Sequence, residues 1–83
     1  MARILYFAWV REKIGIGEEH RTLPQSVHNV AQCLQYLRGL DERHNEALAD
    51  EALRVAVNQE YAQPETAVGD RDEIAFFPPV SGG

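Results

Sequence analysis

The chain ends with the stretch Glu73-Ile74-Ala75-Phe76-Phe77-Pro78-Pro79-Val80-Ser81-Gly82-Gly83. Its first five residues are mostly aromatic or β-branched, which predicts a short final strand over residues 73–77. Pro78 and Pro79 end this strand, because a proline has no backbone N–H to donate to a sheet ladder. A strand so close to the C-terminus needs partners from elsewhere in the chain, so the fold depends on where the other strands lie.

Three other segments are predicted to be strands. Ile4–Val10 is short and rich in aromatic and β-branched residues, so we expect a strand that is apolar on both faces. The glycines and charges of Arg11–Gly17 break it. Glu19–Leu23 then forms a second strand, which ends at Pro24 and pairs with the first as a hairpin. Leu53–Val57 alternates in the manner of a half-buried strand.

Two helices are predicted in the middle of the chain. The main helix begins with Ser26 as its N-cap and ends at Gly39. Its apolar stripe has helical spacing and consists of Val27, Val30, Ala31, Leu34 and Leu37. A second helical segment spans Asp41–Ala49, with Asp41 as its cap. Residues 39–50 carry no functional signature.

The predicted order is two strands, a main helix, a second helical segment and two strands. It favours an α+β fold in which a mixed sheet carries the main helix on one face, and a β-grasp fold satisfies it. The first and last strands can pair in parallel, because the middle of the chain supplies the crossover. We therefore expect one β-grasp domain over residues 1–78 and a C-terminal tail over residues 79–83.

Composition excludes several classes of function. The 83 residues are 45% hydrophobic and 25% charged, as expected of one small globular domain. A formal net charge of -5 argues against nucleic-acid binding, which requires lysine and arginine to neutralise phosphates. The longest apolar run, Ile4–Val10, is far shorter than the roughly 20 residues that span a bilayer, so we expect no membrane insertion. A single cysteine, Cys33, and the lack of a signal-peptide pattern predict a cytoplasmic protein.

Few side chains outside the tail suggest chemistry. His20, His28 and His44 show no metal-ligand spacing, so we expect them at the surface and expect no metal site. Cys33 lies beside the apolar stripe of the main helix and is expected to be a small buried hydrophobe rather than a persulfide carrier. A polar turn explains the acidic residues in 70–73. No nucleophile has an adjacent base, so we expect no catalytic side chains in this chain.

The tail presents one reactive group, the C-terminal carboxylate of Gly83. The five residues from Pro79 to Gly83 reach at most about 17 Å when extended. Glycines suit a tail that enters a narrow channel, because their backbone lacks a Cβ atom. A carboxylate is a poor electrophile, so its use begins with conversion to an acyl adenylate by ATP. Sulfur can then displace AMP and leave a thiocarboxylate.

The residues Asp72–Gly83 closely resemble the C-terminus of the small subunits of molybdopterin synthase. Two further blocks support the resemblance. Phe7-Ala8, followed by Arg11-Glu12 and Gly15, is similar to the first strand and turn of that family, and Val57-Asn58-Gln59 is similar to a third block. Together the blocks span the chain.

The resemblance implies a ubiquitin-like β-grasp fold and a sulfur-carrier subunit in molybdenum cofactor biosynthesis. In that family an ATP-dependent adenylating enzyme activates the terminal glycine and a sulfurtransferase supplies the sulfur. The thiocarboxylate then donates its sulfur to cyclic pyranopterin monophosphate inside the large synthase subunit, in a heterotetramer. The carrier holds no permanent cofactor, ATP is used by the activating enzyme, and the catalytic side chains belong to the large subunit.

The resemblance also assigns roles by position. Gly83 would hold the thiocarboxylate, Gly82 would allow threading, and Val80 and Ser81 would line the inserted tail. Arg71, in the turn before the last strand, stands where many relatives use glycine. This departure concerns the geometry of the turn and not the chemistry of the tail.

A partner surface is expected beside the tail. Phe77, Pro78 and Pro79 are candidates for the rim of the contact, and Arg11 is a candidate interface residue, with a solvated turn as its alternative. The strands carry more aromatic residues than one small core needs, so some must point away from the helix. These aromatic residues are Tyr6, Phe7, Trp9, Phe76 and Phe77. We expect an exposed apolar patch that docks the large subunit and the adenylating enzyme, one at a time.

Three other functions remain open. A ubiquitin-like protein modifier would join the same terminal glycine to a lysine of a target. A sulfur carrier of thiamine thiazole synthesis would share the fold and the ending, although the Phe-Phe-Pro-Pro-Val-Ser sequence argues against it. A binding module with an incidental tail would tolerate deletion of Gly83.

Overall fold

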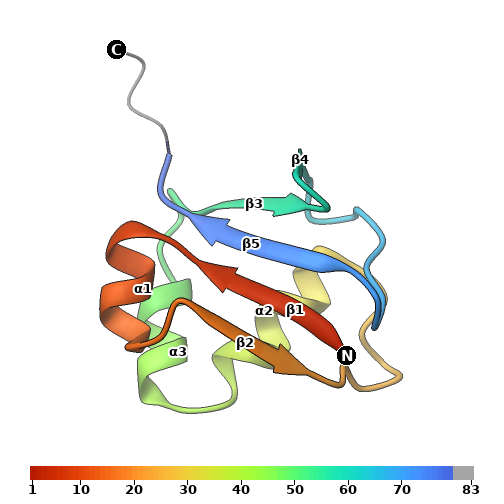
Figure 1. Cartoon of the computed structure of the whole chain (residues 1–83), viewed down its shortest axis with the longest axis horizontal. Helices are drawn as coiled ribbons and strands as arrows, with labels where there is room; N and C mark the ends of the chain where they lie inside the picture. The colour runs from red at the N-terminus through yellow and green to blue at the C-terminus, as the bar shows by residue number, and fades with distance from the viewer. Residues whose placement is uncertain (80–83) are drawn as a thin grey trace.

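The computed structural model describes residues 1–79, which form five strands and three helices around one sheet (Figure 1). The elements in chain order are β1 (Ala2–Tyr6), α1 (Ala8–Ile14), β2 (Glu18–Arg21), α2 (Val30–Arg38), α3 (Glu42–Leu48), β3 (Arg54–Val57), β4 (Glu60–Tyr61) and β5 (Glu73–Phe77). The predicted final strand is confirmed. The roles expected for Val80, Ser81, Gly82 and Gly83 lie outside the described residues.

The sheet has the strand order β2-β1-β5-β3-β4. Its two central strands, β1 and β5, run parallel, with Ile4 opposite Ile74 and Tyr6 opposite Phe76. The other three pairs are antiparallel. The parallel pairing of the first and last strands is thus confirmed, and so is the mixed sheet of a β-grasp fold. Because β1 and β5 run side by side, the chain leaves β5 next to the end of β1 (Figure 1).

The core lies between the sheet and the helices. Ile4 and Tyr6 of β1, and Ile74 and Phe76 of β5, are almost completely buried, because alternate residues of a strand point to the same face. The rings of Tyr6 and Phe76 stack with centroids 6.1 Å apart. Burial of one side chain of this size contributes about 2 to 3 kcal/mol. None of the helices in residues 1–79 covers the opposite face of the sheet (Figure 1), and we call it the open face.

The prediction of one long strand over Ile4–Val10 is wrong. β1 ends at Tyr6, and helix α1 begins at Ala8, whose φ of 52° is left-handed. The backbone N–H of Val10 donates to the carbonyl of Phe7 at 3.1 Å and opens the helix. The residues after Tyr6 become helical because Val10 and the buried Ile14 meet the core at helical spacing. Tertiary packing therefore overrides their strand propensity.

The break predicted over Arg11–Gly17 is only partly right. Its first half continues α1, which ends at Gly15 with a φ of 98°, a conformation that favours glycine. β2 then pairs antiparallel with β1, as predicted. The two strands are joined by a helix rather than by the turn of a hairpin.

The main helix begins later than predicted. Its cap is Asn29, whose side chain accepts the backbone N–H of Gln32 at 2.9 Å. Ser26 instead lies in a turn, in which the N–H of Val27 donates to the carbonyl of Pro24 at 3.0 Å. The predicted end of the helix at Gly39 is confirmed.

The second helix, α3, has the predicted cap. The side chain of Asp41 accepts the backbone N–H of His44 at 2.8 Å. After β3, the positions Asn58 and Gln59 both take positive φ values, of 51° and 69°, and turn the chain into the short strand β4. The predicted strand over Leu53–Val57 ends at this point, and β4 is not predicted from the sequence. None of the helices within residues 1–79 has the length and apolar character needed to cross a membrane.

Candidate functional site

The open face is apolar at the end where the tail begins. Alternation with the buried residues places Leu5 and Phe7 of β1 and its extension on this face. Across the sheet, Leu5 pairs with Ala75, which pairs with Ala56, which in turn pairs with Tyr61. Two alanines therefore separate Leu5 from Tyr61 in this row. This is the kind of surface that the excess of aromatic residues predicts.

The rim of this surface is exposed. Phe7 is 49% exposed and Tyr61 is 76% exposed. The rings of Tyr61 and Phe77 contact each other with centroids 5.9 Å apart. Pro78 is half-buried and Pro79 is exposed, so the base of the tail continues the apolar surface. We call the group of Leu5, Phe7, Tyr61, Phe77 and Pro79 the apolar patch.

The five aromatic residues proposed for the patch divide between the two faces. Tyr6 and Phe76 point into the core, and Trp9 lies on α1, where it packs partly buried against the core. Only Phe7 and Phe77 reach the open face. Tyr61 joins them, although sequence reasoning missed it. The signal that could have found it is Asn58-Gln59, because two adjacent left-handed positions form a hairpin turn that returns the chain to the sheet.

Two arginines flank the apolar patch at the tail end. Arg54 pairs opposite Phe77, and it lines a shallow hollow together with Tyr61, Phe77 and Pro79. Arg11, on α1, lines a second hollow that includes Leu5 and Phe7. Both arginines are exposed. The structure thus brings Arg11, Phe77, Pro78 and Pro79 to one end of the sheet, around the start of the tail.

The other end of the open face is charged. The Arg3 side chain donates to Glu18 at 3.0 Å and to Glu73 at 3.1 Å, and His20 lies 3.0 Å from the same Glu18 oxygen atom that Arg3 contacts through Nε. The hydrogen bond from Arg3 lowers the pKa of Glu18. These charged side chains pair with one another. The apolar end of the open face is therefore the part that remains available for a partner.

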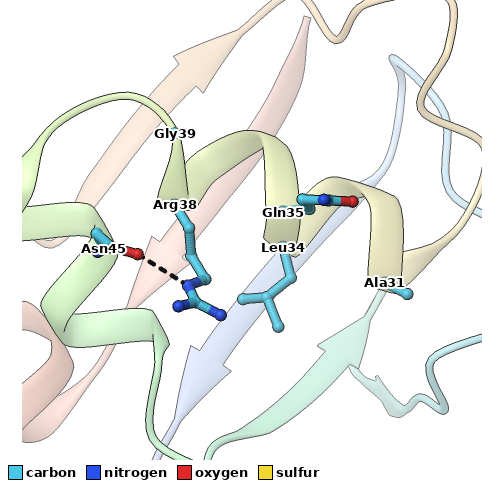
Figure 2. Close-up of a pocket in the computed structure, with 6 residues that line it drawn as sticks. All are labelled: Ala31, Leu34, Gln35, Arg38, Gly39 and Asn45. Atoms are coloured by element: carbon cyan, nitrogen blue, oxygen red, sulfur yellow. Dashed lines mark hydrogen bonds between the residues drawn. The ribbon is translucent and has the colours of Figure 1, made fainter.

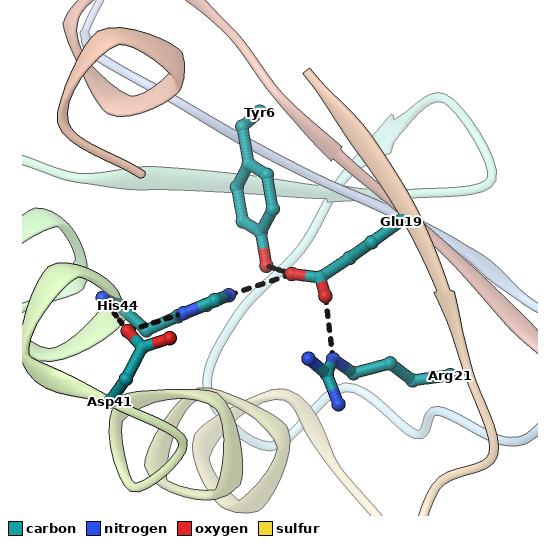
Figure 3. Close-up of polar contacts among 5 residues, drawn as sticks. All are labelled: Tyr6, Glu19, Arg21, Asp41 and His44. Atoms are coloured by element: carbon teal, nitrogen blue, oxygen red, sulfur yellow. Dashed lines mark hydrogen bonds and ion pairs between the residues drawn. The ribbon is translucent and has the colours of Figure 1, made fainter. Parts of the chain in front are cut away.

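A polar network lies on the covered face, between β2 and α3 (Figure 3). Glu19 accepts hydrogen bonds from the hydroxyl of Tyr6 at 2.6 Å and from Nε of Arg21 at 2.6 Å. Nε2 of His44 lies 2.7 Å from Glu19, and Nδ1 of His44 lies 2.8 Å from Asp41. Burial by itself would raise the pKa of Glu19, but these hydrogen bonds outweigh it and the pKa is lowered.

The position of His44 in this network differs from the prediction. His44 was expected at the surface, but only 5% of it is exposed, because the cap of α3 turns its ring toward Glu19. Burial, followed by the hydrogen bond to Glu19, raises the pKa of Tyr6, so this hydroxyl stays a neutral donor. The side chains of His44 and Glu19, at the centre of the cluster, are only 6% and 11% exposed, so a substrate has little access to them. The contact between His44 and Glu19 holds α3 against the sheet.

The remaining candidates have structural explanations. Cys33 is completely buried, and burial raises the pKa of its thiol to about 11, as expected of a small hydrophobe rather than a sulfur carrier. His20 and His28 are exposed. Within residues 1–79, no three histidine, cysteine or carboxylate side chains are grouped as metal ligands.

The acidic turn before β5 is held by its own hydrogen bonds. Asp70 accepts the N–H of Leu23 at 2.8 Å, and Asp72 accepts the N–H of Gly69 at 2.7 Å. Arg71, in the same turn, does not have a positive φ. The turn therefore has no need for the glycine that many similar sequences place there.

A hollow between α2 and α3 lacks the features of an active site (Figure 2). It is lined by Ala31, Leu34, Gln35, Arg38, Gly39 and Asn45. Its one charged group, Arg38, donates to the side chain of Asn45 at 3.0 Å. None of the other five lining residues is titratable, so the hollow offers no pair of groups for acid–base chemistry.

Comparisons with known proteins cover nearly the whole chain. The model of the ThiS family matches residues 4–83. The molybdopterin synthase sulfur carrier subunit of Escherichia coli is 36% identical over 83 residues, which are 100% of both chains. The subunit of the same name from Haemophilus influenzae is 37% identical over 100% of both chains. The human one is 36% identical over 96% of this chain and 91% of its own.

Solved structures agree on the fold. Among them is SAMP1 from Haloferax volcanii, with a TM-score of 0.75 and 28% identity over 99% of this chain and 98% of that one. Another is a putative molybdopterin converting factor, subunit 1, from Pyrococcus furiosus. It has a TM-score of 0.77 and 27% identity over 95% of this chain and 97% of that one.

Proposed function

The chain belongs to the ThiS family, and we propose that it is the sulfur-carrier subunit of a molybdopterin synthase. The observation that carries the proposal is the end-to-end similarity to carriers of that name, in a chain that ends in Gly82-Gly83. The similarity extends over the folded part and over the tail alike. A ubiquitin-like sheet with an apolar patch at the base of the tail supports the same function.

The chemistry acts on the carboxylate of Gly83. An adenylating enzyme uses ATP to form the acyl adenylate and releases pyrophosphate. A sulfur nucleophile at the oxidation level of sulfide then attacks the carbonyl carbon and AMP leaves, so that Gly83 carries a thiocarboxylate. The sulfur passes to cyclic pyranopterin monophosphate, and two loaded carriers are consumed because a dithiolene holds two sulfurs. The carrier binds no permanent cofactor, and the catalytic side chains belong to the large subunit.

The apolar patch is the docking surface in this proposal. Phe7 and Tyr61 are exposed, and Phe77 and Pro78 lead directly into Val80, Ser81 and the terminal glycines. A partner that buries the patch therefore receives the tail in its active site. The large subunit, in a heterotetramer, and the adenylating enzyme would use the same patch in turn. A buried free thiol and the need for ATP favour the cytoplasm.

Intact mass spectrometry tests this function directly. Incubation with the adenylating enzyme, ATP and a sulfur source is expected to replace one terminal oxygen by sulfur. The loaded protein and the large subunit should then convert cyclic pyranopterin monophosphate to molybdopterin. A chain that lacks Gly83 is the control and should gain no sulfur. Loading without conversion would point to another sulfur pathway, such as thiamine thiazole synthesis.

A protein modifier is the second candidate, and the likeness to SAMP1, a small archaeal modifier protein, favours it. Activation of Gly83 would begin in the same way, but a lysine amine of a target would displace AMP. Isolation of the protein from cells that contain the adenylating enzyme separates the two functions. A thiocarboxylate indicates a sulfur donor, whereas exclusively lysine-linked conjugates would rule the donor out.

A further inference from the structure

The basic residues of this chain are almost all arginine. Of eight basic residues, only Lys13 is a lysine, and the other seven are arginines. Lysine and arginine differ in chemistry as well as in shape. A lysine amine attacks activated carbonyl groups once it loses its proton, whereas a guanidinium group stays protonated and is not a nucleophile.

The two basic side chains that flank the base of the tail are both arginines. Arg54 lies opposite Phe77, and Arg11 lines the hollow beside Phe7. Five residues from Pro79 onward reach at most about 17 Å, so Gly83 can approach a side chain at either position. Two groups joined by a short linker meet at an effective concentration in the millimolar range when the linker can span the distance between them. An amine at position 54 or 11 would meet an activated Gly83 far more often than an amine on another molecule would.

The two amines that the chain does contain are each held by another group. The N-terminal ammonium group of Met1 lies 3.3 Å from Asp70, at the end of the sheet where β5 begins. The tail begins at Pro79, six residues beyond Glu73, so about 20 Å of extended chain separates its start from that end of β5, which is more than the roughly 17 Å that the tail can reach. Nζ of Lys13 lies 5.2 Å from the ring centroid of Trp9, in a cation–π contact.

We propose that arginine rather than lysine at positions 11 and 54 prevents the activated Gly83 from forming an internal amide. These residues present positive charge beside the tail without an amine that intercepts the acyl group. The inference rests on the proposed function, because only an activated Gly83 can acylate an amine. The side reaction that they prevent is attack of a lysine nitrogen on the carbonyl carbon. A C–N bond forms, the bond to the leaving group breaks, and the nitrogen loses its proton to solvent.

The test needs no partner enzyme. The chain is prepared with Gly83 as a thioester of a small thiol, so that attack by an amine releases the thiol and leaves an internal amide. Every variant also carries Lys13→Arg, which makes the introduced lysine the only lysine present. Arg54→Lys and Arg11→Lys are compared with Arg71→Lys, an identical change in the turn at the opposite end of β5. The protein is kept at about pH 9, where part of a lysine population is unprotonated.

Intact mass and peptide mapping follow the reaction. We expect Arg54→Lys, and to a lesser degree Arg11→Lys, to lose the thioester at least about tenfold faster than Arg71→Lys, with Gly83 joined to the new lysine. Equal rates in all three variants would overturn the inference. Rapid attack by Met1 in the Lys13→Arg parent would also overturn it. A separate assay of ATP–pyrophosphate exchange with the adenylating enzyme tests the proposed function, so the two can fail independently.

Discussion

The two faces of the sheet use the same strands for opposite purposes. On the covered face, Tyr6 and Phe76 are completely buried and stacked. On the open face, their chain neighbours Phe7 and Phe77 stand at the edge of an exposed apolar surface. Tyr6 and Phe76 therefore stabilise the fold, whereas Phe7 and Phe77 remain available for a partner. Substitutions on the two faces should therefore separate stability from recognition.

The polar residues follow the same division. Glu18 and Glu19 are adjacent in β2, yet Glu18 pairs with Arg3 in solvent, whereas Glu19 holds three partners beneath the sheet. Alternation along a strand is enough to produce this contrast. Neighbouring residues thus provide matched controls for each other.

The largest effect is expected at Phe76. Phe76→Ala removes a fully buried ring and leaves a cavity, which costs about 3 to 5 kcal/mol of unfolding free energy. Phe77→Ala loses only a partial contact with Tyr61 and should cost about 1 kcal/mol or less. Urea denaturation measures both values. Equal losses for the two variants would contradict the division between the faces.

A smaller loss is expected at Glu19. Glu19→Ala leaves Tyr6, Arg21 and His44 without their shared acceptor, at a cost of about 2 to 3 kcal/mol. Glu18→Ala changes the adjacent, solvent-exposed carboxylate and should leave the urea midpoint nearly unchanged. A comparable shift in both variants would show that the network does not hold α3 to the sheet.

Stability should also depend on pH through Glu19. Its pKa is lower in the folded state than in the unfolded chain, so the unfolded state binds a proton more readily. The stabilisation is present in full above the unfolded pKa of about 4.3 and is lost as the pH falls through the lower, folded value. Urea midpoints between about pH 6 and pH 3 measure this loss, and Glu19→Gln should flatten the curve relative to Glu18→Gln. Parallel curves for the two variants would assign the acid sensitivity to other groups.

The smallest effect on stability is expected at the rim of the open face. Phe7→Ser and Tyr61→Ser remove exposed rings, so unfolding should change by about 0.5 kcal/mol or less. Binding to the large subunit should nevertheless weaken at least about tenfold, because exposed aromatic residues serve as anchors in an interface. Calorimetric titration of the two variants checks this expectation. Unchanged binding would place the docking surface elsewhere.

Local signals predicted several of the element boundaries well. The strand that stops at Pro78, the cap at Asp41 and the helix end at Gly39 were all readable, because each depends on backbone chemistry within a few residues. The cap at Asn29 was missed in favour of Ser26, since both residues can cap and only the surrounding structure chooses. The placement of Phe77, Pro78 and Pro79 beside the tail followed from the chain order alone.

The sequence by itself determined the family and a mixed sheet in which the first and last strands pair in parallel. It also determined the terminal Gly82-Gly83 on which the proposed chemistry depends. Only the tertiary structure decided that the apolar run after Tyr6 becomes a helix, because packing of Val10 against the core outweighs strand propensity. It also decided that His44 is buried against Glu19, since partners 25 residues apart meet only after the chain has folded.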